Sequence, residues 1–280
     1  MPGIAASELD LDHVAVGVER QLDVFPRYAD DLGGRWEFSH GNPVFDFSQL
    51  TFANGMRVEV LEPVGDDPDN FLRRFLKNGP GPHHMTFKVT SLDNAIDAAE
   101  SMGYQVVGID RADPGWQEAF LYPKSSMGIV IQFAQPGDDD DDDHEAVPAW
   151  LPPPPVVSPA RLEHVAHAVG DLALGQRLFV QLLAGVVVGS GSDEALQSDW
   201  VDVAWRGPGR VRLLQPQTAA SPMHGWLDGR IGRLHHLRFT GVAESTLERL
   251  CAGHSVTALD KSRFELGPEH NLGVRLLLSA

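Results

Sequence analysis

The sequence has 280 residues, a hydrophobic content of 42% and a formal net charge of −17. This is enough apolar content for two compact domains, and the acidic balance disfavours nucleic-acid and anionic-membrane partners. A single cysteine, Cys251, excludes a disulfide framework, and no signal-peptide pattern or apolar run of about 18 residues is present, which together predict a cytoplasmic protein without a membrane partner.

The first part of the chain predicts a β-α-β-β-β unit. Residues 10–18 alternate apolar and polar side chains as a strand does, and residues 21–32 have the pattern of a helix that ends at Gly33 and Gly34. An Ala53-Asn54-Gly55 turn separates the last two strands, as in a hairpin. The three strands that follow the helix are expected from residue 35, at 45–52 and at 57–61.

A second unit of the same kind follows. A short amphipathic helix at 67–78 leads to a strand that contains His84. A helix at 94–102 is preceded by Ser91 and stopped by Gly103. The remaining strands of this unit are expected at 105–110, 118–122 and 128–133.

Residues 137–159 are predicted to be a linker. The segment contains the acidic run Asp138–Asp143 and the prolines Pro152–Pro155, which favour an extended and stiff chain. The acidic run lacks the spaced ligands and glycine of an EF-hand, so we interpret it as solvated linker. The linker divides the chain into predicted domains at 8–136 and 160–280.

The second half repeats the first. The segment LDHVAV at 11–16 recurs as LEHVAH at 162–167, and PHHMTF at 82–87 recurs as LHHLRF at 234–239. The segments lie roughly 150 residues apart, which indicates an internal duplication. Each half also contains two shorter repeats, so the chain is predicted to hold four β-α-β-β-β units in an α+β fold.

Four polar residues occupy equivalent places in the first two units. His13 and His84 lie in the first strands, and Glu59 and Gln132 lie in the last strands. If the paired sheets curve, these side chains converge on the concave face. Two imidazoles with a carboxylate and an amide oxygen form a mixed nitrogen and oxygen site that suits Fe²⁺, Co²⁺, Mn²⁺, Ni²⁺ or Zn²⁺. Strand alternation places His83 on the face opposite His84, so we expect His83 and its counterpart His235 to be structural.

Three motifs of the first half resemble a known family. They are RVEVLEP at 57–63, FLKNGPGPHH at 75–84 and FLYPKSSMGI at 120–129. They are similar to stretches of the vicinal oxygen chelate superfamily, which includes glyoxalases, bleomycin resistance proteins and extradiol dioxygenases. The likeness is strongest to methylmalonyl-CoA epimerases, which usually have a histidine where this chain has Tyr122.

The resemblance implies that His13, Glu59, His84 and Gln132 bind a divalent metal ion. It also implies catalytic roles for Glu59 and Gln132. Gln132 departs from the family, which has an acid there, and no glutamate occurs in the stretch 39–46 that would supply a second one. In this chain the acid is therefore expected at Glu59 and the amide at Gln132, so that the two residues have exchanged roles. The implied substrate is a small molecule with two neighbouring oxygens, which bind the metal together.

The second half has lost this pattern. Its equivalents are His164, Arg212, His236 and Leu277, and arginine cannot ligate a metal. We expect no metal in that half and a role in covering the first half or in replacing a dimer partner, so that the protein is a monomer or a homodimer.

Three functions remain open from the sequence. The first is a metal-dependent isomerase or epimerase that acts on a small carbonyl compound, including an acyl-CoA, through an enolate. The second is an Fe²⁺ dioxygenase that uses His13, His84 and Glu59 as a two-histidine, one-carboxylate set. The third is a protein that binds a small molecule without catalysis.

Overall fold

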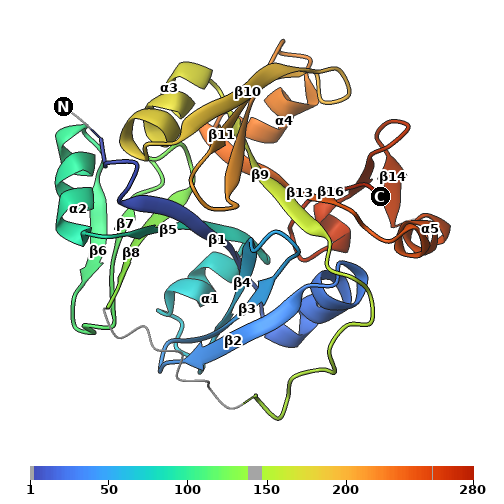
Figure 1. Ribbon diagram of the computed structural model, residues 1–280, viewed down its shortest axis with the longest axis horizontal. Coiled ribbons are helices and arrows are strands. Elements are labelled where there is room, and N and C mark those ends of the chain that lie inside the picture. The colour runs from blue at the N-terminus through green and yellow to red at the C-terminus, as the bar shows by residue number, and fades with distance from the viewer. Residues whose placement is uncertain (1–2, 138–146, 254) are drawn as a thin grey trace. The chain divides into compact units, whose positions relative to one another are not determined.

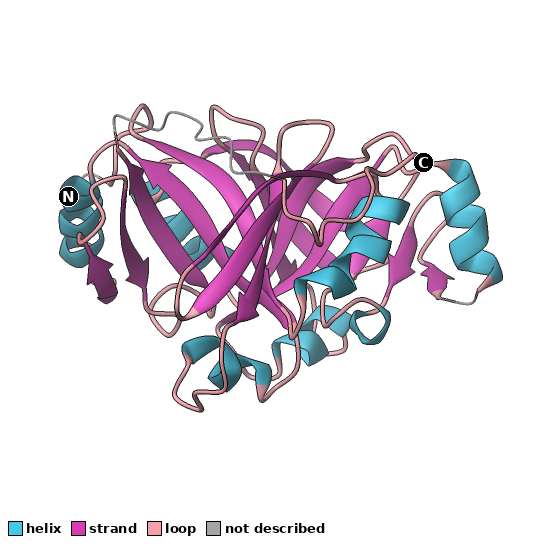
Figure 2. Ribbon diagram, turned by 90° about the horizontal axis from the view of Figure 1, so that it is seen from below, coloured by secondary structure: helices cyan, strands magenta, loops and turns pink. Residues whose placement is uncertain are grey.

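The computed structural model describes residues 3–137, 147–253 and 255–280 (Figure 1). The acidic run Asp138–Asp143 of the predicted linker lies outside the described residues. Strand dominates over helix in the described part of the chain (Figure 2).

The first half contains the two predicted β-α-β-β-β units. Asn70 caps α1 (Phe71–Leu76) and Ser91 caps α2 (Leu92–Ser101) by accepting hydrogen bonds from the backbone of the first turn. The helix α2 covers β6, β7 and β8 (Figure 1). The strands are β1 (Leu9–Gly17), β2 (Arg35–Gly41), β3 (Phe45–Thr51), β4 (Arg57–Pro63), β5 (Gly81–Val89), β6 (Val106–Asp110), β7 (Trp116–Leu121) and β8 (Val130–Pro136).

The segment predicted as one helix at 21–32 is divided in two. A 3₁₀ turn, η1 (Gln21–Val24), precedes a π-type segment, η2 (Pro26–Asp31). Pro26 explains the difference, because proline has no N–H to donate and its ring collides with the carbonyl four residues earlier. The sequence pattern locates the segment correctly and misses its internal break.

The second half repeats this order of elements. Its helical segments are α3 (Leu172–Gln176), η3 (Arg177–Leu182), α4 (Pro222–Leu227), α5 (Glu244–Ala252) and η4 (Pro268–His270). Its strands are β9 (Arg161–Val169), β10 (Val186–Asp193), β11 (Ser198–Ala204), β12 (Arg210–Pro216), β13 (Gly232–Thr240), β14 (Val256–Ala258), β15 (Phe264–Leu266) and β16 (Leu276–Leu278).

The strands form two eight-stranded mixed sheets. The first has the order β2-β3-β4-β1-β5-β8-β7-β6, and the second has the order β10-β11-β12-β9-β13-β16-β15-β14. The pairs β5·β8, β12·β9 and β13·β16 are parallel, whereas the hairpin pairs are antiparallel. Both sheets are open, with β2 and β6 at the edges of the first. The predicted α+β fold with tandem β-α-β-β-β units is confirmed.

Close packing divides the chain into two compact units that do not follow chain order. The first unit lies within Met1–His13, His84–Asp141 and His164–His235, and the second lies within Val14–His83, Asp142–Glu163 and His236–Ala280. Each unit therefore combines one repeat from each half of the chain. The independence of the predicted domains 8–136 and 160–280 stays a prediction.

In the first unit, a tight backbone contact joins the two halves of the chain. Met127 and Gly128 both have positive φ angles, 58° and 78°. A Cβ atom added at Gly128 would overlap the carbonyl oxygen of Gly232, and one added at Gly232 would overlap that of Met127. The ring of His167 donates from Nε2 to the Met127 carbonyl at 2.7 Å, so this junction is fixed by both packing and a buried hydrogen bond.

The second unit contains the counterpart of that junction. A Cβ atom at Gly273 would overlap the carbonyl oxygen of Pro80, immediately before β5. Phe239 packs edge-on against Phe52 and Tyr28, with ring centroids 4.9 and 6.5 Å away. Asp31 is paired with both Arg27 and Arg249, which come from different halves. These contacts join the two halves of the chain within this unit, and the replacement of a dimer partner by the second half stays a prediction.

Candidate metal centre

Three of the four predicted ligands come together. His13 lies on β1, Glu59 on β4 and His84 on β5, and these three strands are neighbours in the first sheet. Their ligand atoms all lie within 4.8 Å of one another. The side chains are buried, with exposed fractions of 1%, 8% and 5% in that order. Among the described residues, this is the one group of three or more His, Cys, Asp or Glu side chains with that geometry.

The two imidazoles face each other at close range. The ring centroids of His13 and His84 are 5.9 Å apart, with an interplanar angle of 66°. Nδ1 of His13 lies 2.8 Å from Oδ2 of Asp12. A carboxylate at one ring nitrogen fixes the orientation and tautomer of the imidazole, and directs the lone pair of the other nitrogen toward a metal. This contact assigns Nε2 of His13 as its ligand atom.

Glu59 is oriented by its cross-strand neighbour. Gln49 on β3 lies directly opposite Glu59, and its Nε2 donates a hydrogen bond of 3.3 Å to Glu59 Oε1. A buried carboxylate requires such a donor or a cation to offset its lost hydration. The pair leaves Glu59 as a buried, oriented carboxylate beside two imidazoles.

Gln132 makes hydrogen bonds through both ends of its amide. Its Oε1 accepts from Thr86 Oγ1 at 2.5 Å, and its Nε2 donates to Glu118 Oε2 at 2.6 Å. Thr86 and Gln132 are register partners on β5 and β8, which explains why they meet. In this geometry Gln132 connects two polar side chains of the first unit, and its roles as a fourth ligand and a catalytic group stay predictions.

Two acidic residues near the site were missed by the sequence analysis. Asp12 was overlooked because strand alternation places it and His13 on opposite faces, yet the two side chains meet. For Glu118 the sequence contained a usable signal, because alternation along β7 places it on the same face as Phe120. The ring of Phe120 lies 6.5 Å from that of His84. Glu118 also accepts a hydrogen bond from Trp116 Nε1 at 3.2 Å.

His83 and His235 pack against aromatic rings. The ring of His83 lies 5.7 Å from Phe71 and 4.9 Å from Phe75, and burial lowers the His83 pKa to about 4. His235 is buried and meets Trp226 edge-on at 5.3 Å. The structural role expected for both histidines from the sequence stays a prediction.

The second half places an ion pair where the first half has Glu59. Arg212 donates to both carboxylate oxygens of Asp202, at 2.7 and 2.6 Å, and its guanidinium lies 4.2 Å from the centre of the Trp200 ring. His164 and His236 are buried, as is Leu277. The guanidinium is thus held by a carboxylate and an aromatic face, which gives this position a structural use.

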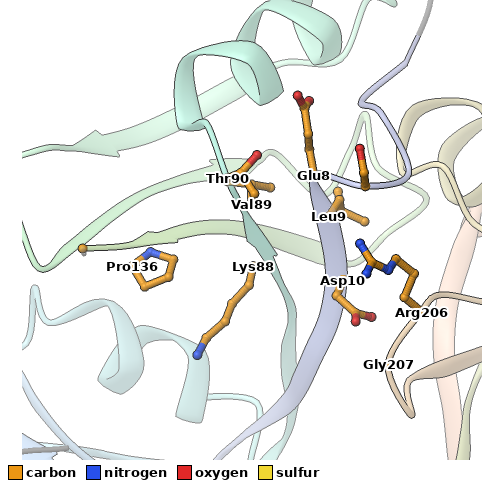
Figure 3. A pocket seen from close by; sticks show the side chains of 11 residues that line it. Glu8, Leu9, Asp10, Lys88, Val89, Thr90, Pro136, Arg206 and Gly207 are labelled. Carbon is orange, nitrogen blue, oxygen red and sulfur yellow. The ribbon is translucent and has the colours of Figure 1, made fainter. Parts of the chain in front are cut away.

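A cavity of about 650 Å³ lies beside Lys88 in the first unit. Lys88 Nζ is 3.7 Å from Asp12 Oδ1, so Asp12 connects this lysine with His13. Figure 3 shows Lys88 extending away from Asp10, which lies close to Arg206 and Gly207. Burial raises the Asp10 pKa, and the charges around the cavity are mixed in sign.

Comparison with known proteins agrees with this arrangement. A family profile described as Glyoxalase/Bleomycin resistance protein/Dioxygenase superfamily matches residues 12–122, which include His13, Glu59 and His84. The chain carries a domain of this superfamily. The uncharacterized protein YqjC of Bacillus subtilis strain 168 is 29% identical over 134 residues, which are 45% of this chain and 91% of YqjC.

One of two solved structures compared with this chain has a similar fold over both halves. A triple mutant of 4-hydroxymandelate synthase from Streptomyces coelicolor has a TM-score of 0.63 and 15% identity, and it covers 100% of this chain and 93% of its own. Methylmalonyl-CoA epimerase from Mycobacterium tuberculosis has a TM-score of 0.41 and 24% identity, over 46% of this chain and 88% of its own. The first likeness shows that the tandem fold spans both halves.

The helices within the described part of the chain are all too short or too polar to traverse a bilayer. The cytoplasmic location stays a prediction.

Proposed function

We propose that this protein is a metal-dependent isomerase or epimerase that acts on a small carbonyl compound with two neighbouring oxygens. The observation that carries the proposal is the buried group of His13, Glu59 and His84, whose ligand atoms lie within 4.8 Å of one another. Two imidazole nitrogens and a carboxylate oxygen are a donor set that fits Fe²⁺, Co²⁺, Mn²⁺, Ni²⁺ or Zn²⁺.

The residues around the site would have three roles: holding the metal, orienting a ligand and moving a proton. A bound divalent cation would polarise the substrate carbonyl and stabilise the charge that develops on its oxygen. His13, Glu59 and His84 would hold the cation, and Asp12 would orient His13 through Nδ1. We assign the movement of the proton to the Glu59 carboxylate, whose Oε1 is held by Gln49.

The make-up of the three clustered donors favours a second candidate, an Fe²⁺ oxygenase. The cluster contains two histidines, His13 and His84, and one carboxylate, Glu59. That set is typical of non-haem Fe²⁺ oxygenases.

Two assays separate the candidates. The metal-loaded chain is incubated in D₂O with methylmalonyl-CoA or acetoin, and NMR follows deuterium at the carbon beside the carbonyl. Oxygen uptake is then measured with the Fe²⁺-loaded chain and catechol. Deuterium wash-in that Glu59→Gln abolishes supports the isomerase, and oxygen uptake without wash-in supports the oxygenase. A metal-loaded chain that gives neither deuterium wash-in nor oxygen uptake would support the third hypothesis, a non-catalytic binding protein.

Asp12→Asn is expected to weaken metal binding by roughly 10–100-fold, because carboxylates that hold a ligand histidine contribute about that much to affinity. Asn keeps the size of the side chain and loses the charge that faces Nδ1 of His13. Competition with a fluorescent metal chelator measures the change.

Asp10→Asn is the matched control. Asp10 lies on the same strand and beside Arg206 instead of His13, so its metal affinity is expected to equal that of the parent. Equal losses in both variants would show that general acidity, rather than contact with His13, sets the affinity.

A further inference from the structure

One face of β2, β3 and β4 carries Glu59 and a group of aromatic side chains. The register places Phe38, Gln49 and Glu59 in one row across the three strands. The next row contains His40, Phe47 and Leu61, and the row after it contains Phe45 opposite Pro63. Because alternate residues share a face, these side chains lie on the same side of the sheet as Glu59.

The rings in these rows form one connected group, which we call the aromatic strip: Phe38, His40, Phe45 and Phe47. The ring of Phe47 lies 5.7 Å from Phe38, 6.1 Å from His40 and 6.2 Å from Phe45. The spacings are those of favourable edge-to-face and tilted ring pairs. The strip therefore starts at the row that contains Glu59 and continues without interruption.

The strip is exposed at one end and packs on the protein at the other. Phe38 is 37% exposed, whereas Phe45 and Phe47 are half-buried against Leu61 and Leu72. On the other face, Ser48, Leu50, Val58 and Val60 are fully buried. Exposed aromatic side chains in a connected group are typical of binding surfaces.

The charges near Glu59 lie on the side away from the strip. Beyond Glu59, the bulge residue Glu37 of β2 accepts from Arg57 Nε at 2.6 Å and also from the Thr51 hydroxyl. The strip itself carries no carboxylate, lysine or arginine. A planar apolar group would thus suit the phenylalanine rings of the strip.

We propose that the aromatic strip binds an aromatic ring of the substrate, attached to the two neighbouring oxygens that would be held at His13, Glu59 and His84. This proposal rests on the proposed function and narrows its substrate class to aryl-substituted carbonyl compounds. Stacking and burial of a ring on the strip would supply binding energy that an aliphatic substrate lacks.

The test uses two probes that share one chelating head. Benzoylformate and pyruvate are both 2-oxo acids, and they differ in a phenyl or a methyl group beside the carbonyl. Isothermal titration of the Co²⁺-loaded full chain measures both affinities. The phenyl probe is expected to bind at least about tenfold more tightly, because burial of a ring is worth more than burial of a methyl group.

Phe38→Ala is expected to remove most of that preference, measured as the ratio of the two affinities. Trp150→Ala is the matched control, because Trp150 is similarly exposed (41%) and packs on Phe25 outside the strip. Phe47→Leu, which keeps apolar bulk without a ring, should lose part of the preference.

Three results would overturn the proposal while Co²⁺ is bound: equal affinities for the two probes, a preference that survives both strip variants, or an equal loss in Trp150→Ala. A chain that binds no Co²⁺ would instead contradict the proposed function. The metal content of each sample therefore separates the two failures.

Discussion

Gly232→Ala is expected to destabilise the protein by about 3 kcal/mol, at the upper end of the range for overpacking of a buried site. The new Cβ would overlap the Met127 carbonyl oxygen and lie 2.9 Å from His167 Nε2. The backbone on both sides would have to separate, and the His167–Met127 hydrogen bond would be lost with it. Urea unfolding followed by circular dichroism measures the free energy of unfolding.

Gly225→Ala provides the matched control for that substitution. Gly225 lies within α4, and a Cβ atom there meets nothing within 4 Å. Alanine in a helix is favoured over glycine by up to about 1 kcal/mol, so this variant should be as stable as the parent or slightly more so. Equal stability of the two variants would mean that the junction at Gly232 yields easily and does not hold the two repeats together.

The second large effect is a loss of folding stability at low pH, which we attribute to His167. Burial lowers the pKa of His167 to about 4, whereas the unfolded chain should titrate this group near its ordinary value of about 6.5. Above pH 6.5 the ring is neutral in both states and its contribution to stability is complete. Between pH 6.5 and 4 the unfolded state binds the proton first, so stability falls, by about 3 kcal/mol in total.

His167→Gln should remove that part of the pH dependence. Glutamine can still donate to the Met127 carbonyl but does not titrate. The free energy of unfolding, measured in urea at pH 7 and at pH 4, should fall less in the variant than in the parent, by about 3 kcal/mol. Parallel losses in the two proteins would show that His167 is protonated as easily in the folded state as in the unfolded state.

The repeat pattern predicted the elements well because the same short signals recur in each unit. Alternation located β1, β4, β5 and β8 to within a few residues, and Ser91 and Gly103 marked the limits of α2. Equivalence between repeats then selected His13, Glu59 and His84, because residues at equivalent places in paired strands face the same concave surface. Local pattern and internal symmetry were sufficient for this part of the site.

Contacts that depend on long-range packing could not be predicted from the pattern. Gln132 accepts from Thr86 because β5 and β8 are adjacent in a particular register. The contact between Gly232 and Met127 joins repeats from different halves of the chain, and nothing local to either segment signals it. Asp12 meets His13 against the simple rule of alternation. The sequence thus predicts the candidate donors by type and place, but the fold determines their hydrogen-bond partners.

The measurement that tests the central claim most directly is the metal content per chain, with no His-tag on the protein. The parent and a His13→Ala/His84→Ala double variant are each reconstituted with Fe²⁺, Co²⁺ or Mn²⁺, freed of unbound ions and analysed by plasma mass spectrometry. About one equivalent in the parent and none in a folded double variant is expected, since the variant lacks two of the three grouped donors. No metal in the parent with any of the three ions, or undiminished metal in the variant, would contradict a metal centre at His13, Glu59 and His84.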